Sequence, residues 1–255
     1  MAAEAPVATR VEFRPDLLAP DKDYPQFRML VCRDRYAGYF AGRGCGKTAV
    51  LVADAFRYAD AFSGSIQILT EASWQMIKDI LIPKITDFYG EQRERSFHMT
   101  ESPPINVTFT NGSQLWLRST DVKERLYGME VARVLMDEIA IEHQEGAYLI
   151  LDGAIRQHGY PHQMKVAGTP KGRNWLWRKF VRDGLRHFTA ETLDAEKAGF
   201  VEEGYADGLA LQYGGWDSPL ARQELGAAWV EMAGQGYPQF GRSIHVRSLP
   251  TGVLA

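Results

Sequence analysis

Residues 41–48 read Ala-Gly-Arg-Gly-Cys-Gly-Lys-Thr, and this stretch indicates the fold class most directly. A short β-prone apolar run precedes it at 36–41, and residues 47–60 follow with a helical pattern. A glycine-rich turn that joins a strand to a helix and ends in Gly-Lys-Thr is the phosphate-binding loop pattern. Ala41 stands where that pattern has its first glycine, and we expect Gly42 to supply the tight turn instead. The alternative is a glycine-rich turn that matches by chance.

The residue types of this loop suit a nucleoside triphosphate. Glycines let backbone N–H groups turn inward around phosphate oxygens, and the following helix adds its positive end. Lys47 is expected to reach the β- and γ-phosphates, and the Thr48 hydroxyl to bind Mg²⁺. Cys45 could be a redox thiol, but we interpret it as a small residue in a loop that exposes its backbone. The expected nucleotide contacts in this loop are Gly42, Arg43, Gly44, Cys45, Gly46, Lys47 and Thr48.

A second motif follows at Asp137-Glu138, where a buried strand over 131–136 is expected to end. Asp137 is predicted to hold Mg²⁺ through water. Glu138 is predicted to act as the general base: its carboxylate, near the γ-phosphate, would orient and deprotonate the attacking water. The alternative is a strand that ends in two solvated acids. The adjacent glutamate favours ATP hydrolysis over a small kinase or a GTPase.

The rest of the chain alternates strands and helices, which predicts a mainly parallel sheet with helices on both faces. Asn111-Gly112 is the exception, since it joins two alternating runs and predicts an antiparallel hairpin. Ser73 is a plausible N-cap for a helix that Pro83 interrupts or kinks. Further strands are expected at 66–70, 106–110, 114–118 and 163–167, and further helices at 142–157, 174–186 and from Ser218-Pro219 to about 232.

Composition narrows the function classes. The 255 residues are 45% hydrophobic and 24% charged, which argues against disorder. The net charge of −3 argues against a strongly basic protein that coats nucleic acid, although it is compatible with a local DNA contact. Two cysteines cannot form a disulfide framework and favour a reducing compartment. No apolar run approaches the roughly 18 residues of a membrane span, and residues 1–8 lack a secretory pattern. We expect a cytosolic protein without a membrane partner.

The ordered motifs resemble the ATPase domain of the large terminase subunit, the DNA-packaging motor of tailed bacteriophages. The loop at 42–48 is similar to the family's phosphate loop, which usually carries an arginine at the place of Arg43. Residues 126–138 resemble its L-R-G … D-E-A block, with Tyr127 for the usual arginine and Ile139 for a small residue. Three further stretches carry the likeness: Gly168–Trp175 resembles the coupling motif, Pro25-Gln26 the glutamine motif that contacts adenine, and 222–225 the segment before the family's linker.

The resemblance implies an α/β phosphate-loop NTPase of the additional-strand, catalytic-glutamate type. It implies ATP and Mg²⁺ as cofactors and double-stranded DNA as substrate. The implied partners are the small terminase subunit and a portal protein on the procapsid, where the family forms a ring that we expect to be a pentamer. Such a motor works in the host cell cytoplasm, transiently at the portal, and is no structural component of the mature virion.

The expected domain organisation follows the motifs. We expect an N-terminal arm at 1–24, an ATPase core at 25–192, a helical subdomain at 193–233 and a tail at 234–255. Family members continue into a nuclease domain, and this chain stops where that domain would begin. We therefore expect a truncated form that does not cleave DNA.

Three further roles are expected. Thr169, in the segment like the coupling motif, would couple hydrolysis to movement. An arginine is needed at the phosphoryl group, and the candidates are Arg43 in cis and Arg125 in trans, with Lys123 as an alternative to Arg125. On a continuous helix Arg178, Arg182 and Arg186 would form one stripe facing DNA phosphates, or else a solvated or subunit-facing surface.

Two other functions compete with DNA packaging. A helicase-like nucleic-acid-dependent ATPase would share Gln26, the loop and Asp137-Glu138, but it needs a second RecA-like domain, for which the residues after Thr169 are too few. A nucleotide-binding regulator that hydrolyses little is the other, and Glu138 and Thr169 argue against it. DNA-stimulated ATP turnover separates these functions.

Overall fold

The fold is built outward from β1 (Tyr36–Ala41), the strand that leads into the phosphate loop. In the computed structural model the described residues are 11, 12, 14, 18, 22–100, 102–141 and 144–232. The expected tail at 234–255 and most of the expected N-terminal arm lie outside them. Val11 and Leu18, which are described, are buried in the core.

Within the described residues the strands form one eight-stranded sheet, in the order β3-β4-β5-β2-β6-β7-β1-β8. All neighbouring strands are parallel except for the pairs β3–β4 and β4–β5. The α/β class with a mainly parallel sheet and a hairpin at Asn111-Gly112 is therefore confirmed, and Gly112 has a φ of +83°. The remaining strands are β2 (Ile66–Glu71), β3 (Phe97–Met99), β4 (Asn106–Phe109), β5 (Gln114–Ser119), β6 (Arg133–Met136), β7 (Gln163–Gly168) and β8 (Arg186–Ala190).

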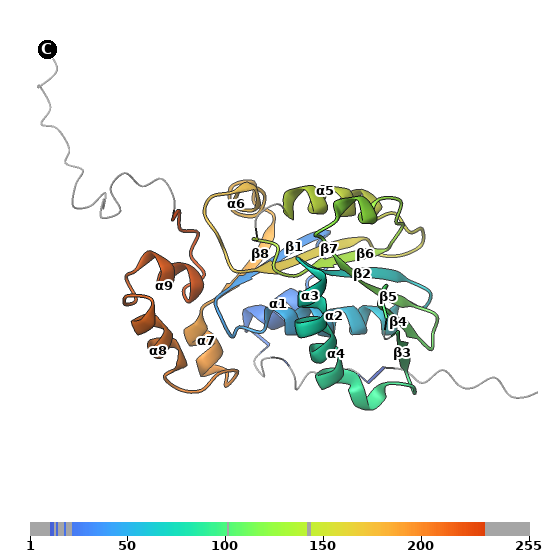
Figure 1. The fold of residues 1–255 in the computed structure, drawn as a ribbon, viewed down its shortest axis with the longest axis horizontal. Helices are drawn as coiled ribbons and strands as arrows, with labels where there is room; N and C mark the ends of the chain where they lie inside the picture. Colours follow the sequence, from blue (N-terminus) through green and yellow to red (C-terminus); the bar gives the residue numbers. More distant parts are fainter. Residues whose placement is uncertain are drawn as a thin grey trace, which may run out of the picture.

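Helices cover both faces of this sheet (Figure 1). On one face lie α1 (Pro25–Val31), α2 (Lys47–Ala61) and α4 (Ile82–Tyr89), and on the other α5 (Gln144–Ala154) and α6 (Trp175–Trp177). The buried apolar side chains divide into two main clusters accordingly, one around α2 and one around α5. Because β7 lies between β6 and β1, the sheet has the additional strand that the family resemblance implied.

The helix that begins after Ser73 is continuous but changes its winding. Ser73 caps it by accepting a hydrogen bond from Met76 N, as predicted. Helix α3 (Trp74–Met76) passes into a π-helical segment at Ile77–Leu81 and then into α4, in whose first turn Pro83 lies. Proline cannot donate a backbone hydrogen bond, and the π turn directly before it accommodates this loss. The proline thus alters the helix without ending it.

The helix predicted over 174–186 is wrong only in its last residues, 183–186. Asn174 caps α6 and a π-helical segment continues over Arg178–Arg182. The segment then stops at Asp183, whose N–H reaches Arg178 O, and Gly184 follows with a φ of +79°. Arg186 begins β8, which pairs with β1. The sequence signal for this strand was weak because it lies at the sheet edge and is only partly buried.

The helical subdomain contains α7 (Thr192–Lys197), α8 (Tyr205–Gln212) and α9 (Pro219–Glu224), gathered at one end of the sheet (Figure 1). Helix α9 starts at Ser218-Pro219 as predicted, and the Ser218 side chain caps it by accepting from Ala221 N. The helix ends at Glu224, short of the expected 232, where Leu225 and Gly226 turn the chain back toward the core.

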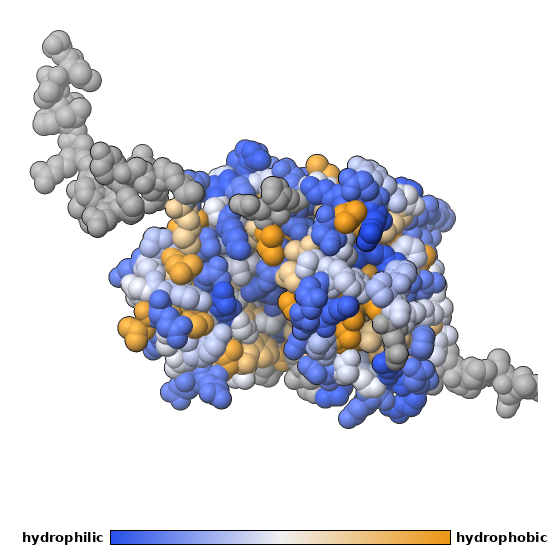
Figure 2. Space-filling view, in the orientation of Figure 1, coloured by the Kyte–Doolittle hydropathy of each residue, from blue (hydrophilic) through white to orange (hydrophobic). Residues whose placement is uncertain are grey.

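Hydrophobic residues are scattered over the face shown in Figure 2 and do not gather into one large patch. None of the described helices has the length and apolar character needed to cross a membrane.

Candidate nucleotide-binding site

The phosphate loop lies at the carboxyl end of β1 and runs directly into α2, as predicted. Gly44 and Gly46 have φ values of +77° and +67°, which L side chains rarely adopt, so the loop needs glycine at both positions. Gly46 is the N-cap of α2, and its carbonyl accepts a hydrogen bond of 3.0 Å from Gln26 Nε2. Gln26 is fully buried. The predicted glutamine motif therefore meets the phosphate loop across twenty residues of sequence.

Gly42 is needed for a different reason from the one expected. Its φ lies outside the left-handed region, so it does not supply the tight turn. A Cβ at this position would lie 2.4 Å from Leu225 O and 2.6 Å from Thr192 Oγ1. Thr192 Oγ1 also donates to Arg43 O, so the helical subdomain packs directly onto the loop. Glycine is required here by close approach, and Ala41 is tolerated as the last residue of β1.

Lys47 and Thr169 meet at one backbone carbonyl. Lys47 Nζ donates to Ala41 O at 3.0 Å and to Gly42 O at 2.9 Å. Thr169 Oγ1, which follows β7, donates to Ala41 O at 3.4 Å. The residue predicted to couple hydrolysis to movement thus lies against the loop that would hold the phosphates.

Cys45 is buried, and its Sγ lies 3.2 Å from Glu191 O. Burial raises the pKa of this thiol to about 11, so it stays protonated at neutral pH. A thiolate is the reactive form of cysteine. The structure therefore supports the interpretation of Cys45 as a small loop residue rather than a redox thiol.

Asp137 and Glu138 follow β6, as the sequence predicted. Asp137 is buried, and burial raises its pKa to about 6; the charge of Glu138 raises it too, while Thr48 and Lys47 lower it. Asp137 Oδ1 accepts from Glu138 N at 3.0 Å. Glu138 has a φ of +46°, an uncommon conformation for a residue with a side chain. Such backbone strain is typical of functional sites, where the surrounding structure maintains it.

The residues present fit a Mg²⁺ ion. Asp137 Oδ2 is buried and has no hydrogen-bond partner among the described residues. The Thr48 side chain interacts with the same carboxyl group. A hydroxyl and a carboxylate are oxygen ligands of the kind that Mg²⁺ prefers. Thr48 and Asp137 are therefore suited to hold the ion, directly or through water.

Glu71 is an acidic residue of this site that the sequence analysis missed. It is the last residue of β2, whose Thr70 pairs with Met136, so it lies beside Asp137. Its side chain is fully buried, and neither carboxyl oxygen has a hydrogen-bond partner in the described part of the chain. Burial raises its pKa to about 9, with contributions from Asp137 and Glu138. The sequence signal that could have identified Glu71 is an acidic residue at the end of an apolar strand.

One cavity of about 560 Å³ joins these elements. It brings together the phosphate loop, Glu138, Thr169 and the helical subdomain, whose Tyr205 and Glu224 form part of its wall. Arg125 and the predicted basic stripe do not line it. The lining residues are Arg43, Gly44, Gly46, Lys47, Thr48, Ala49, Lys84, Glu138, Thr169, Lys171, Tyr205 and Glu224.

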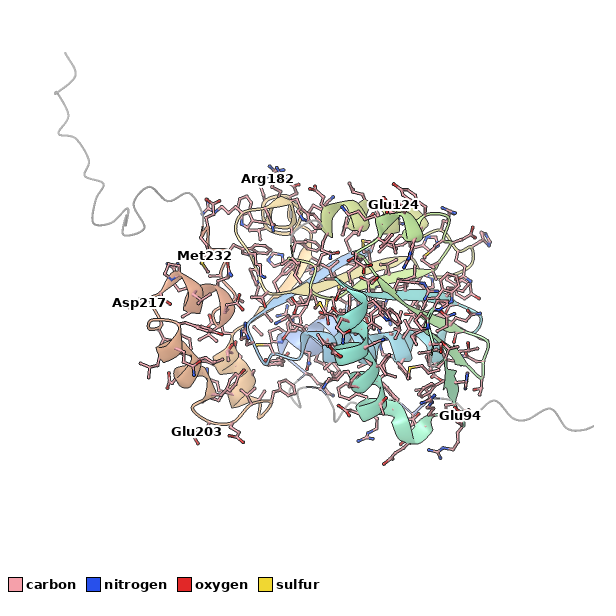
Figure 3. The ribbon with its side chains drawn as sticks, in the orientation of Figure 1. Glu94, Glu124, Arg182, Glu203, Asp217 and Met232 are labelled. Carbon is pink, nitrogen blue, oxygen red and sulfur yellow. The ribbon has the colours of Figure 1, made fainter. Side chains whose placement is uncertain are left out.

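The two arginine candidates differ in position. Arg43 lines the cavity and pairs with Glu224. Arg125 is exposed in a 3₁₀ turn at Lys123–Leu126. Glu124 of the same turn is labelled in Figure 3. Lys123 is directed at α5, since a Cβ at Gly146 would lie 2.9 Å from its Nζ. Arg125 therefore faces solvent more openly than its alternative does.

The predicted stripe of three arginines does not exist as one helix face, because Arg186 lies on β8. Arg178 and Arg182 remain on the π-helical segment, and Arg182 points outward above α6 (Figure 3). Arg182 pairs with Asp183 at 2.7 Å, and Arg186 with Asp34 at 2.9 Å. A contact of these arginines with DNA stays a prediction.

Sequence comparison identifies no relative of this chain: no protein-family model matches it, and no curated protein matches it. Its structure is similar to the large terminase ATPase domain of Thermus phage P74-26, with a TM-score of 0.60 and 18% identity over 87% of this chain and 100% of that one. A second similar structure, the large terminase of a thermophilic bacteriophage, has a TM-score of 0.66 and 12% identity, with 81% of this chain and 53% of that protein covered.

The HK97 bacteriophage large terminase is similar too, with a TM-score of 0.61 and 12% identity over 86% of this chain and 51% of that one. The chain thus spans about half the length of these last two proteins. The terminase of the thermophilic bacteriophage has also been solved in complex with ADP and with ATP-γ-S. Together with the strand order and the loop geometry, these similarities establish that this chain has the fold of a phage large terminase ATPase domain, of the phosphate-loop NTPase class.

Proposed function

We propose that this chain is the Mg²⁺-dependent ATP-hydrolysing motor domain that drives double-stranded viral DNA into a procapsid. The observation that carries the proposal is the single cavity in which Lys47, Thr48, Glu138 and Thr169 converge. These residues follow three separate strands, and three separate motifs predicted them. The fold adds support, because ATPase domains of large terminases share it.

In this proposal ATP binds with its phosphates in the loop. Lys47 turns from its backbone carbonyls to the β- and γ-oxygens, and Gln26 holds the loop at the adenine end. Mg²⁺, held by Thr48 and Asp137, would neutralise charge on the β- and γ-phosphates. Glu138 deprotonates the attacking water as a general base.

Two segments would transmit the conformational change from the nucleotide site to the rest of the domain. Thr169 would lose its γ-phosphate contact on hydrolysis and transmit the change to Asn174 and α6. The helical subdomain would respond through Gly42 and Arg43, because it touches the loop at both residues. Either Arg43 in cis or Arg125 in trans would supply the positive charge that the transferring phosphoryl group needs.

The proposed partners follow from the proposed packaging function. A ring, expected to be a pentamer, would form on the portal of the procapsid with help from the small terminase subunit, in the host cell cytoplasm. Arg178 and Arg182 would contact DNA phosphates in its pore. The large terminases of HK97 and of the thermophilic bacteriophage support this assembly only by their shared fold.

Two assays test the proposal in sequence. The purified chain should hydrolyse ATP with Mg²⁺, faster with double-stranded DNA, and Lys47→Ala should lose both nucleotide binding and turnover. A motor assembled on portal-bearing procapsids should then protect DNA from added nuclease only when ATP is present. Strand separation without packaging would support the helicase-like alternative. Nucleotide binding with no turnover, with or without DNA, would support a regulator.

A further inference from the structure

The cavity has a cationic wall that no motif predicts. Lys84, on α4, lines it, and α4 belongs to none of the segments that form the phosphate loop, the acidic strand end or the coupling segment. We propose that Lys84 binds the phosphate chain of the nucleotide in cis. This inference rests on the proposed function and names a further residue of the same site.

The position of Lys84 is held by the core. Its helix is anchored by Ile85 and Phe88, both buried, and α4 packs against α2, the helix that follows the phosphate loop (Figure 1). The Lys84 side chain is half-buried, and its Nζ lies 5.2 Å from the centroid of the Phe88 ring. This cation–π contact restricts where the ammonium group lies, and Lys84 itself lines the cavity.

The charge of Lys84 is also available. Within the described residues it forms no ion pair with a carboxylate, whereas Arg43 pairs with Glu224 and Lys47 donates to two backbone carbonyls. A nucleoside triphosphate adds several negative charges to a cavity that already contains Glu138 and Glu224. An unpaired ammonium group on the wall favours binding of such an anion.

Lys171 is the other cation of the cavity lining that forms no ion pair with a described residue, but fewer contacts hold it in place. It is exposed and lies in the loop between Thr169 and Asn174, with no aromatic ring beneath it among the described contacts. Lys84 is fixed on a helix and needs less ordering to bind. Less loss of conformational freedom on binding means a larger net contribution.

The chain supplies a matched control in Lys78. It lies on the same continuous helix, and its Nζ is 5.8 Å from the Trp74 ring centroid, but it does not line the cavity. Lys84→Gln keeps much of the stem and removes the charge. Lys78→Gln makes the same change outside the site. Lys84→Arg keeps the charge.

The experiment measures the affinity of the whole chain for ATP-γ-S, ADP and adenosine with Mg²⁺ present. Lys84→Gln should weaken ATP-γ-S about tenfold, as expected for one charge-assisted contact in a partly exposed site. ADP should weaken less and adenosine should be unaffected. Lys84→Arg should restore most of the affinity, and Lys78→Gln should bind like the unchanged chain.

The outcomes separate the inference from the proposed function. If the unchanged chain binds ATP-γ-S and Lys84→Gln binds it equally well, the role of Lys84 is overturned while the proposed function stands. An equal loss for adenosine also overturns it, because the contact would then not be with phosphate. If the unchanged chain binds no nucleotide, the proposed function fails and the inference fails with it. Thermal unfolding of each variant identifies any loss of folding. If Lys84→Gln is unfolded, the affinity of Lys84→Arg for ATP-γ-S tests the inference: near-normal affinity supports it, and a loss as large as that expected for Lys84→Gln overturns it.

Discussion

Arg43 of the phosphate loop and Glu224 of α9 form an ion pair, with Nε and Oε2 3.3 Å apart. The backbone reinforces it, since Arg43 N donates to Glu224 O at 3.0 Å. The Arg43 side chain is 53% exposed, so the pair contributes about 0–1 kcal/mol to stability. Its importance is therefore positional: the arginine that could act on the γ-phosphate is held by the helical subdomain.

Releasing Arg43 from this pair should strengthen nucleotide binding. Glu224→Gln removes a negative charge from the cavity wall and frees the arginine, so we expect ATP-γ-S to bind a few-fold more tightly, by about 1 kcal/mol or less. Arg43→Ala should weaken turnover. A double-mutant cycle, measured by calorimetric titration, decides whether the effect passes through Arg43: the gain from Glu224→Gln should shrink when Arg43 is already alanine. Full additivity would show that the two residues act separately.

Glu138→Gln should keep nucleotide binding and lose hydrolysis. The amide is isosteric and Asp137 can still hold Mg²⁺, but the general base is gone, and such a loss costs about 10²–10⁴-fold in rate. Phosphate release under saturating ATP measures it. Glu145→Gln, an exposed change in the first turn of α5, serves as the control and should turn over normally. If Glu138→Gln retained more than half of the turnover rate of the unchanged chain, the assignment of Glu138 as the general base would be wrong.

Thr169→Ala should affect DNA movement more than ATP binding. The side chain loses its 3.4 Å contact with Ala41 O and its expected contact with the γ-phosphate, while Lys47 and the loop stay in place. In a packaging motor we expect the length of DNA protected from nuclease to fall strongly and ATP-γ-S affinity to change by less than about threefold. Thr169→Ser retains a hydroxyl and should restore packaging. Normal packaging by Thr169→Ala would refute the coupling role.

Asp54→Asn should destabilise the core by about 3–5 kcal/mol. Asp54 is buried on α2, and it accepts hydrogen bonds from Arg133, from Lys165 at 2.8 Å and from Arg57 at 2.7 Å. Burial raises the pKa of Asp54, but the three cations lower it by more than burial raises it. The pKa of Asp54 therefore lies well below its usual range. Removing the carboxylate leaves buried cations without a counter-charge.

Urea denaturation measures this loss, with Asp87→Asn on the exposed side of α4 as the control. The stabilisation from a depressed carboxyl pKa is present above its unfolded value of about 3.9 and is lost as pH falls below it. The difference between the unchanged chain and Asp54→Asn should therefore be full at pH 7 and shrink below about pH 4. A stability loss under about 1 kcal/mol at pH 7 would contradict the buried-charge argument.

Glu71→Gln should stabilise the fold at alkaline pH. The folded state holds the Glu71 proton up to a pKa of about 9, whereas the unfolded chain releases it near 4.5. Between these values the folded state binds more protons, so its stability falls as pH rises, by up to about 1.4 kcal/mol per pH unit. The glutamine variant lacks this proton and should have a flatter profile.

The measurement is denaturant unfolding from pH 5 to 9 without Mg²⁺, with Glu91→Gln as an exposed control. We expect the Glu71→Gln variant to exceed the unchanged chain by more than about 1 kcal/mol at pH 8. Asp137 titrates in both proteins, and the loss of its interaction with Glu71 is part of the expected difference between the two curves. Parallel curves would show that Glu71 is charged in the folded state.

Local patterns predicted much of the fold. The strand at 36–41, the helix from Lys47 and the hairpin at Asn111-Gly112 each depend on neighbouring residues, and each was confirmed. The cap at Ser73 and the helix start at Ser218-Pro219 were confirmed for the same reason, because a side chain that binds a backbone N–H three residues on needs no distant partner. The edge strand β8 was missed because a short, partly exposed segment has little apolar signal.

The residues that could hold phosphates and metal were readable from the chain alone, because Gly46-Lys47-Thr48 and Asp137-Glu138 are contiguous motifs. What surrounds them emerged from the packing in three dimensions. Strand order placed Glu71 beside Asp137, and the packing of α4 on α2 directed Lys84 to the cavity. Contacts of this kind join residues far apart in the chain, and their geometry depends on how whole strands and helices pack. No local pattern carries that information.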